Sequence, residues 1–108
     1  MDKDTERRVA RNESLFREAN EAIGRGLWPE QEDTVIRFRC ECAAQCGQPV
    51  ELSHREYERI RRNSRWFVVL EGHGIPDVEE VVERHDGWMV VQKTETGGDV
   101  AEGLDPRD

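Results

Sequence analysis

Residues 37–52, RFRCECAAQCGQPVEL, contain all three cysteines of this 108-residue chain. Before the cysteines, residues 34–40 (TVIRFRC) place Ile36 and Phe38 on one face and arginines on the other, an alternation typical of a strand. After them, residues 49–52 (PVEL) predict a short returning strand. We therefore predict a β-hairpin with the cysteines at its tip.

The three cysteines, Cys40, Cys42 and Cys46, have the spacing Cys-x-Cys-x3-Cys. The amino-terminal sequence MDKDTERRVARNE has no apolar stretch of the kind found in secretory signals, so we expect a reducing cytoplasm. There, an odd number of close thiols fits metal binding better than disulfides. Thiolates are zinc ligands, and a structural zinc site has four ligands. The sequence therefore predicts one structural Zn²⁺ and a fourth ligand from elsewhere.

The fourth ligand can be sought among three histidines. His73 lies between two glycines in a loop, where nothing structural requires an imidazole and the backbone can approach a metal closely. His54 lies just inside a predicted helix and is near the cysteines in sequence, whereas His85 adjoins a predicted turn. We favour His73 and keep His54, or no fourth protein ligand, as alternatives.

The remaining pattern predicts an α+β fold in one small domain. Residues 4–23 have helical periodicity, with Val9, Phe16 and Ile23 on the apolar face. Ser53 and Glu56 form a capping box that begins a short second helix. Residues 65–70 predict a buried strand. Asp86-Gly87 favours a hairpin turn, so residues 78–84 are interpreted as a strand although their valines also fit one helical turn.

These elements divide the chain into three parts. Residues 1–26 are expected to form an amphipathic helix, and residues 27–93 a zinc-stabilised α+β domain with a connector at residues 27–33 and a small antiparallel sheet. Residues 94–108 have no clear periodicity and are expected to be a disordered acidic tail.

Composition and charge argue against two classes of protein, membrane-spanning proteins and dedicated nucleic-acid binders. The net charge is −8 and the mean hydropathy is −0.87. No apolar run of about 18 residues is present, so no membrane-spanning helix is expected. A net negative charge disfavours a dedicated nucleic-acid binder, because neutralising phosphates dominates that kind of affinity.

A local basic cluster is nevertheless present in residues 59–66, which lie within the stretch ERIRRNSRWF (residues 58–67). Basic side chains beside an aromatic ring can hold a nucleic-acid backbone and stack on a base. The alternative is a solvated helix face, with arginine stems covering the core, that meets an acidic protein surface or this chain's own acidic tail. The candidate binding residues are Arg59, Arg61, Arg62, Arg65 and Trp66.

Three functional hypotheses follow. The first is a non-enzymatic interaction or regulatory protein that zinc holds together and that binds a protein partner through its first helix or its arginines. The second is a redox sensor, either an iron–sulfur cluster or bare thiols activated by Arg37 and Arg39. The third is a weak nucleic-acid-binding module. Catalysis is disfavoured, because Glu41 and Glu71 beside the proposed ligands are expected by chance in so acidic a chain.

The succession RNESLFREAN, CECAAQC, LSHREYERIR and RWFVVLEGHGIPDVEEVVERHDGWMVVQK resembles a group of small, uncharacterised actinobacterial proteins. The resemblance covers roughly residues 10–105. Members of that group pair a Cys-x-Cys cluster with a later Gly-His, which implies Cys40, Cys42, Cys46 and His73 as the metal-binding set. The group usually lacks a histidine at the position of His54, and it has a Gly/Asp-rich turn where this chain has AAQC. It implies no activity.

Overall fold

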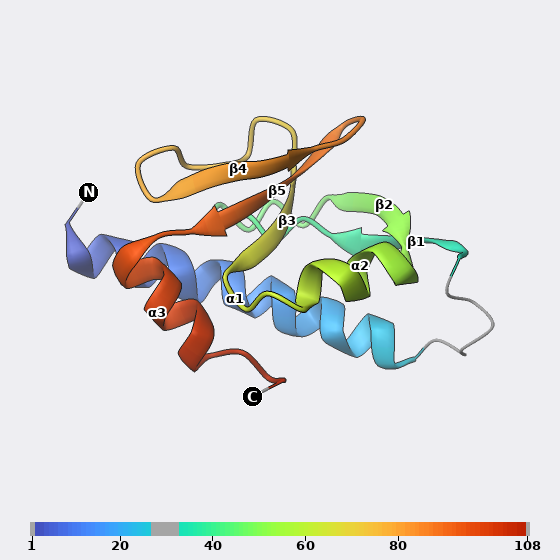
Figure 1. Ribbon diagram of the computed structural model, residues 1–108, viewed down its shortest axis with the longest axis horizontal. Coiled ribbons are helices and arrows are strands. Elements are labelled where there is room, and N and C mark those ends of the chain that lie inside the picture. The colour runs from blue at the N-terminus through green and yellow to red at the C-terminus, as the bar shows by residue number, and fades with distance from the viewer. Residues whose placement is uncertain (1, 27–32, 108) are drawn as a thin grey trace.

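The computed structural model describes residues 2–26 and 33–107, and most of the predicted connector therefore lies outside the described residues. Figure 1 shows the strands above and the long first helix running beneath them. The elements in chain order are α1 (Lys3–Arg25), β1 (Val35–Arg39), β2 (Pro49–Ser53), α2 (His54–Arg61), β3 (Trp66–Leu70), β4 (Glu79–Arg84), β5 (Trp88–Lys93) and α3 (Glu95–Gly103).

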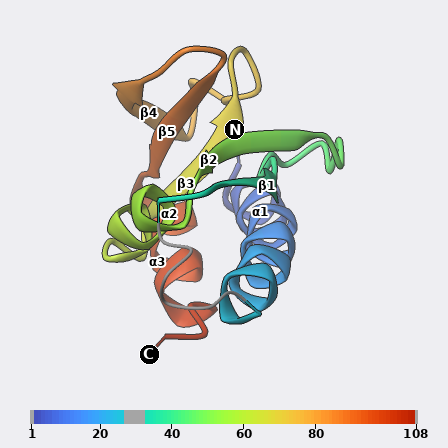
Figure 2. The same cartoon turned by 90° about the vertical axis from the view of Figure 1, so that its right-hand side faces the viewer.

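The strands form two antiparallel sheets, so the α+β prediction is confirmed, although one sheet had been expected. The first is the predicted hairpin, in which β1 pairs with β2 and Phe38 lies opposite Val50. The second has the order β3-β5-β4, with Val68 opposite Val90 and Val81 opposite Val91. Figure 2 shows the two sheets side by side, with β4 at the outer edge farthest from β1.

Residues 78–84, whose valines also fitted a helical turn, form a strand of the second hairpin from residue 79 onward. His85 donates its N–H to the carbonyl of Trp88 (2.9 Å), which closes the turn between β4 and β5. Gly87 has φ +84°, a left-handed conformation that glycine adopts without steric strain. The Asp86-Gly87 turn prediction is therefore confirmed, and residues 79–84 are extended.

Helix α1 forms as predicted but buries a different face. Asp2 caps it by accepting a hydrogen bond from the N–H of Thr5 (2.8 Å). Phe16 and Ile23 of the predicted face are only half-buried, and Leu15 beside them is 58% exposed. The face that meets the rest of the molecule is largely polar and consists of Ala10, Glu13, Ser14, Arg17, Asn20, Glu21 and Gly24.

Several charged side chains on the polar face of α1 have partners in distant elements. Arg17 donates to the carbonyls of Ser64 (2.6 Å) and Ala101 (2.7 Å) and lies over the ring of Phe67, 4.6 Å from its centroid. The carboxyl group of Glu13 lies 2.8 Å from Nζ of Lys93 in β5, and both side chains are fully buried. Periodicity of apolar residues alone misplaced the buried face, because ion pairs and hydrogen bonds let charged side chains occupy it.

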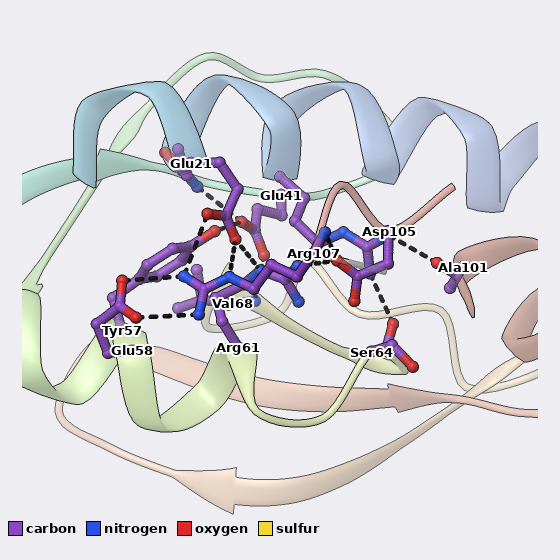
Figure 3. A network of polar contacts seen from close by, with 12 residues as sticks. Glu21, Glu41, Tyr57, Glu58, Arg61, Ser64, Val68, Ala101, Asp105 and Arg107 are labelled. Atoms are coloured by element: carbon purple, nitrogen blue, oxygen red, sulfur yellow. Dashed lines mark hydrogen bonds and ion pairs between the residues drawn. The ribbon is translucent and has the colours of Figure 1, made fainter. Parts of the chain in front are cut away.

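A second buried network joins α1, α2 and the carboxy-terminal segment (Figure 3). Arg61 of α2 is 2% exposed and pairs with both Glu21 and Asp105. Arg107 in turn bonds Glu21 (2.7 Å) and Glu58 (2.9 Å). Two cations and three carboxylates thus hold three segments that are far apart in sequence.

Helix α2 agrees closely with the prediction. Ser53 and Glu56 form the capping box, in which the side-chain oxygen of each residue accepts a hydrogen bond from the backbone N–H of the other. Tyr57 and Ile60 are fully buried, and the Tyr57 ring stacks on Phe38 with centroids 4.4 Å apart. This stacking ties α2 to the first hairpin.

The prediction of a disordered tail is wrong. Residues 95–103 form α3, which packs against α1 (Figure 1). Ala101 is fully buried, and Arg65 pairs with Asp99 (2.9 Å) and Glu102 (2.6 Å) of this helix. Acidic residues of this segment pair with an arginine of the domain, although the segment lacks the clear periodicity on which the prediction rested. Among the described residues, no helix is both long and apolar enough to cross a membrane.

Candidate metal centre

Cys40, Cys42, Cys46 and His73 lie together, with their ligand atoms all within 4.8 Å of one another. The sulfur of Cys40 is 3.7 Å from Nδ1 of His73. Cys40 and Cys42 are buried, and Cys46 and His73 are half-buried. The four residues therefore form a compact cluster that is open to the surface on one side.

The cysteine loop owes its shape to backbone hydrogen bonds and two unusual conformations. Cys40 donates its N–H to Gln48 (2.9 Å), which extends the hairpin by one step, and Gln45 donates to the carbonyl of Cys42 (3.1 Å). Gln45 and Gly47 have φ +54° and +69°. These left-handed positions fold the chain back so that Cys46 returns toward Cys40 and Cys42.

His73 reaches the cluster from the loop between β3 and β4. Its N–H donates to the carbonyl of Leu70 (3.0 Å), which turns the chain directly after β3. The N–H of Leu70 donates to the sulfur of Cys40 (3.2 Å). A hydrogen bond to sulfur favours the thiolate form that metals require. The cluster therefore joins the first sheet to the second.

Glu41, between two of the cysteines, fixes the loop from the opposite side. Its N–H donates to the carbonyl of Val68 (2.8 Å), and its side chain accepts from the N–H of the same residue (2.9 Å). The carboxylate also accepts from Asn20 (2.8 Å) and the hydroxyl of Tyr57 (2.7 Å) (Figure 3). Burial raises the pKa of Glu41, although these three donors lower it.

The role of Glu41 was missed in the sequence. Its place between two cysteines on a strand pattern indicates that its side chain points away from them. Nothing in the sequence shows that Asn20, Tyr57 and Val68 converge on it, because those contacts are made by three other elements. Glu41 therefore positions the cysteines and does not face the cluster as an acid or base.

The thiols of the cluster differ in acidity. Burial raises the pKa of Cys40 well above its usual value of 9.0. Burial also acts to raise the pKa of Cys42, but hydrogen bonds from the Cys46 backbone, from His73 and from the other two thiols outweigh it and lower this pKa to about 7. The cluster thus contains one thiol that ionises readily, and it gives that thiol its hydrogen-bond partners.

One distance within the donor set has the length expected between two ligands of a tetrahedral metal ion. Zinc–sulfur bonds of about 2.3 Å and zinc–nitrogen bonds of about 2.0 Å place tetrahedral ligands roughly 3.5–3.8 Å apart. The distance of 3.7 Å between Cys40 Sγ and His73 Nδ1 matches this edge. Three thiol sulfurs and one imidazole nitrogen are the ligand types of structural zinc sites.

The other histidines lie outside this cluster. His54 approaches Glu58 through Nε2 (3.2 Å) and packs against Gly24 at the far end of α1. His85 stacks on Trp88, with ring centroids 3.9 Å apart, and contacts Glu83 through Nε2 (2.9 Å). Of the three histidines, the structure places only His73 with the cysteines.

The predicted arginine cluster does not form a single exposed surface. Arg59 makes two hydrogen bonds to Glu83 (2.6 and 2.8 Å), Arg61 is buried, and Arg65 pairs with α3. Arg62 is exposed, and Trp66 is half-buried and donates its Nε1–H to Gln92 (2.9 Å). Three of the four arginines are therefore neutralised by carboxylates of this chain.

The comparisons with known proteins give one partial likeness. Over 65 residues the chain is 38% identical to the CRISPR-associated endonuclease Cas9 of Corynebacterium diphtheriae. The match covers 56% of this chain but spans only 6% of that protein's length. No protein-family model matches the chain, and no solved structure matches it. The likeness concerns a short segment of a much longer protein.

Proposed function

We propose that this protein is a small non-enzymatic interaction module whose Cys40, Cys42, Cys46 and His73 hold one structural Zn²⁺. The observation that carries the proposal is the convergence of four donor atoms within 4.8 Å from two separate sheets. A metal ion there would bind the β1–β2 hairpin to the loop after β3. Its bonds would replace apolar area that a chain of this size has in short supply.

A structural role agrees better with the site than a catalytic one. Four protein ligands fill a zinc tetrahedron, whereas a catalytic zinc keeps a position for water or substrate. The carboxylate nearest in sequence, Glu41, is turned into the core and accepts hydrogen bonds from three donors. It is therefore unavailable to act on a metal-bound water.

The first experiment measures metal content and absorbance of protein purified without oxygen. We expect one zinc per chain in the wild type and in His54→Ala, and a loss of zinc or a much weaker affinity in His73→Ala. His54→Ala is the matched control, because it removes an imidazole that lies outside the proposed zinc site. Absence of metal in the wild type, or equal loss in both variants, would refute the zinc site.

The same measurement separates zinc from the redox alternative. An iron–sulfur cluster would colour the protein, since it absorbs visible light, whereas zinc thiolates are colourless. Bare thiols would leave the protein free of metal and reactive toward a thiol reagent. Either result would replace the structural zinc proposal with redox sensing.

A nucleic-acid contact is the second function, favoured by the likeness of a segment to an endonuclease. Arg62 is the exposed arginine of the predicted cluster, while Arg59 and Arg65 are paired with carboxylates. We expect weak, steeply salt-dependent retention on single-stranded DNA if this function is real. Retention that Arg62→Ala leaves unchanged would exclude this surface.

A further inference from the structure

A groove borders the loop that carries His73, and none of the three cysteines lines it. Its volume is about 690 Å³, within the range of ligand-binding cavities. Gly72 and Gly74, the neighbours of His73, both line it. The other apolar lining comes from the loop and from the β4–β5 hairpin and consists of Ile75, Pro76, Val81, Met89 and Val91.

The strand beside this groove has a free edge. Within residues 2–26 and 33–107, β4 pairs with β5 on one side and with no strand on the other. Val81 and Val82 on β4 are 41% and 38% exposed. An unpaired edge offers backbone donors and acceptors to an added strand, and an adjacent apolar pocket can take that strand's side chains.

The charge around the groove favours a cationic occupant. Glu71, Glu79 and Glu80 line it together with a single arginine, Arg84, whose Nη1 lies 3.5 Å from the sulfur of Met89. Glu79 is buried, bonding Lys93 and the N–H of Ile75. Glu71 and Glu80 are exposed, so their carboxylates give the groove its negative charge.

We propose that this groove binds an extended peptide segment of a partner protein, in which apolar and basic residues alternate, as an added strand on the free edge of β4. Successive side chains of a strand point to opposite faces. Val81 lies opposite Val91 and shares its face, whereas Glu80, which also lines the groove, is the next position along the strand and belongs to the alternate face. The apolar residues of the peptide would therefore enter the groove, and its basic residues would meet Glu80.

We further infer that zinc controls peptide binding by this groove, and this part of the inference rests on the proposed zinc site. His73 points to the cysteines while its two glycine neighbours form part of the groove, so a metal that fixes His73 also fixes that wall. Binding a strand to a preformed wall costs less conformational entropy than ordering the loop at the same time. Peptide binding should therefore be tighter in the zinc-loaded protein than after chelation.

The test uses three labelled hexapeptides and fluorescence anisotropy with the full chain. The probes are Lys-Val-Lys-Val-Lys-Val, the same sequence with glutamate for lysine, and the lysine peptide with alternate backbone amides N-methylated. We expect the lysine peptide to bind about tenfold more tightly than the glutamate peptide, since opposite charges across strands attract and like charges repel. N-methylation should abolish binding by removing the ladder hydrogen bonds.

Charge reversal locates the site. Glu80→Lys should weaken binding of the lysine peptide and strengthen that of the glutamate peptide. Glu51→Lys makes the same charge change at an exposed position on the other sheet and should alter neither. Equal binding of the two peptides, or equal effects of the two reversals, would overturn the proposal.

Two further results separate the alternatives. A dimer in sedimentation equilibrium that Val81→Lys dissociates would mean that a second copy covers β4, which would overturn the peptide as occupant. Zinc content is measured on each sample. If the zinc-loaded chain binds no peptide, the groove proposal is refuted and the zinc site stands. If the metal-free chain binds the peptide, the zinc site and its control over the groove are refuted, and peptide binding by the groove stands.

Discussion

Two polar clusters join the layers of this molecule, and they depend on different conditions. The Cys40–Cys42–Cys46–His73 cluster connects the two sheets, and under the proposed function it does so through a metal ion. The buried face of α1 connects helices and strands through ion pairs, such as those of Glu21 with Arg61 and Arg107, that need only correctly charged side chains. Under the proposed function, we therefore expect the first cluster to respond to metal supply and the second to pH.

The difference also concerns how each cluster is built. Three ligands of the first lie within seven residues of one hairpin, so folding that hairpin nearly completes the site. The ion pairs of the second join residues 40 to 86 positions apart, so they form only when the whole chain has folded. Three of the four candidate ligands are therefore local to one hairpin, whereas the ionic interface is entirely a consequence of the tertiary fold.

Loss of the metal should have the largest effect. Structural zinc binds small domains with about 10–16 kcal/mol, more than the usual stability of such a domain. We expect Cys42→Ser to unfold most of the protein at 37 °C, as measured by circular dichroism and urea titration. Ala44→Ser, an exposed change in the same loop, is the control. A Cys42→Ser variant as stable as this control would show that the ionic interface suffices.

Breaking the ionic interface should have the next largest effect. Arg61→Ala removes the shared partner of Glu21 and Asp105 and leaves two carboxylates in a buried site, which should cost about 3–5 kcal/mol in the free energy of unfolding. Arg62→Ala removes the adjacent, exposed arginine and should cost little. Urea denaturation of both variants checks this. Similar losses would contradict the buried network.

Tyr57→Phe tests the link between the two clusters. The variant keeps the ring that stacks on Phe38 but loses the hydroxyl that donates to Glu41, so we expect a loss of about 1–3 kcal/mol. Because Glu41 positions the cysteine loop, zinc transfer to a competing chelator should also be faster. Lower stability with an unchanged transfer rate would show that the two clusters are energetically separate.

The pH dependence of stability tests the buried contact of Glu13 with Lys93 and Glu79. Burial, followed by the neighbouring Glu79, raises the pKa of Glu13 well above its ordinary 4.5, while Lys93 acts to lower it. The folded state therefore keeps a proton that the unfolded state loses, and stability falls as the pH rises above about 4.5 toward the higher folded pKa. Glu13→Gln keeps a neutral side chain at every pH and should remove this fall.

The measurement is the stability difference between Glu13→Gln and the wild type at several pH values. The difference should be small near pH 4 and should favour the variant as the pH rises through this window. A variant that is destabilised most at high pH would mean that Glu13 is ionised beside Lys93 and that the ion pair prevails over burial.

The smallest effect is expected on the surface. Arg59 bonds Glu83 on β4, but the Arg59 side chain is 41% exposed, so Arg59→Ala should cost less than about 1 kcal/mol. Its comparison with Arg61→Ala, two positions along the same helix, measures how burial changes the value of an arginine–carboxylate pair. Equal losses would contradict that comparison.

The sequence by itself determined the features that depend on neighbouring residues. Alternation around residues 34–52 predicted the first hairpin, Ser53 and Glu56 predicted the start of α2, and Asp86-Gly87 predicted the turn before β5. Each of these rests on a local pattern of dihedral angles or hydrogen bonds. Cysteine spacing likewise singled out the candidate metal-binding loop, because thiolates are rare and their chemistry is distinctive.

Only the tertiary structure decided the rest. It brought His73, and not His54, to the cysteines, it buried Glu13, Arg17 and Arg61, and it folded residues 95–103 into a helix on α1. These outcomes depend on partners distant in the chain. A charged residue is stable in the interior only where an opposite charge or a hydrogen-bond partner meets it, and the sequence of α1 contains no record of which partners the fold supplies.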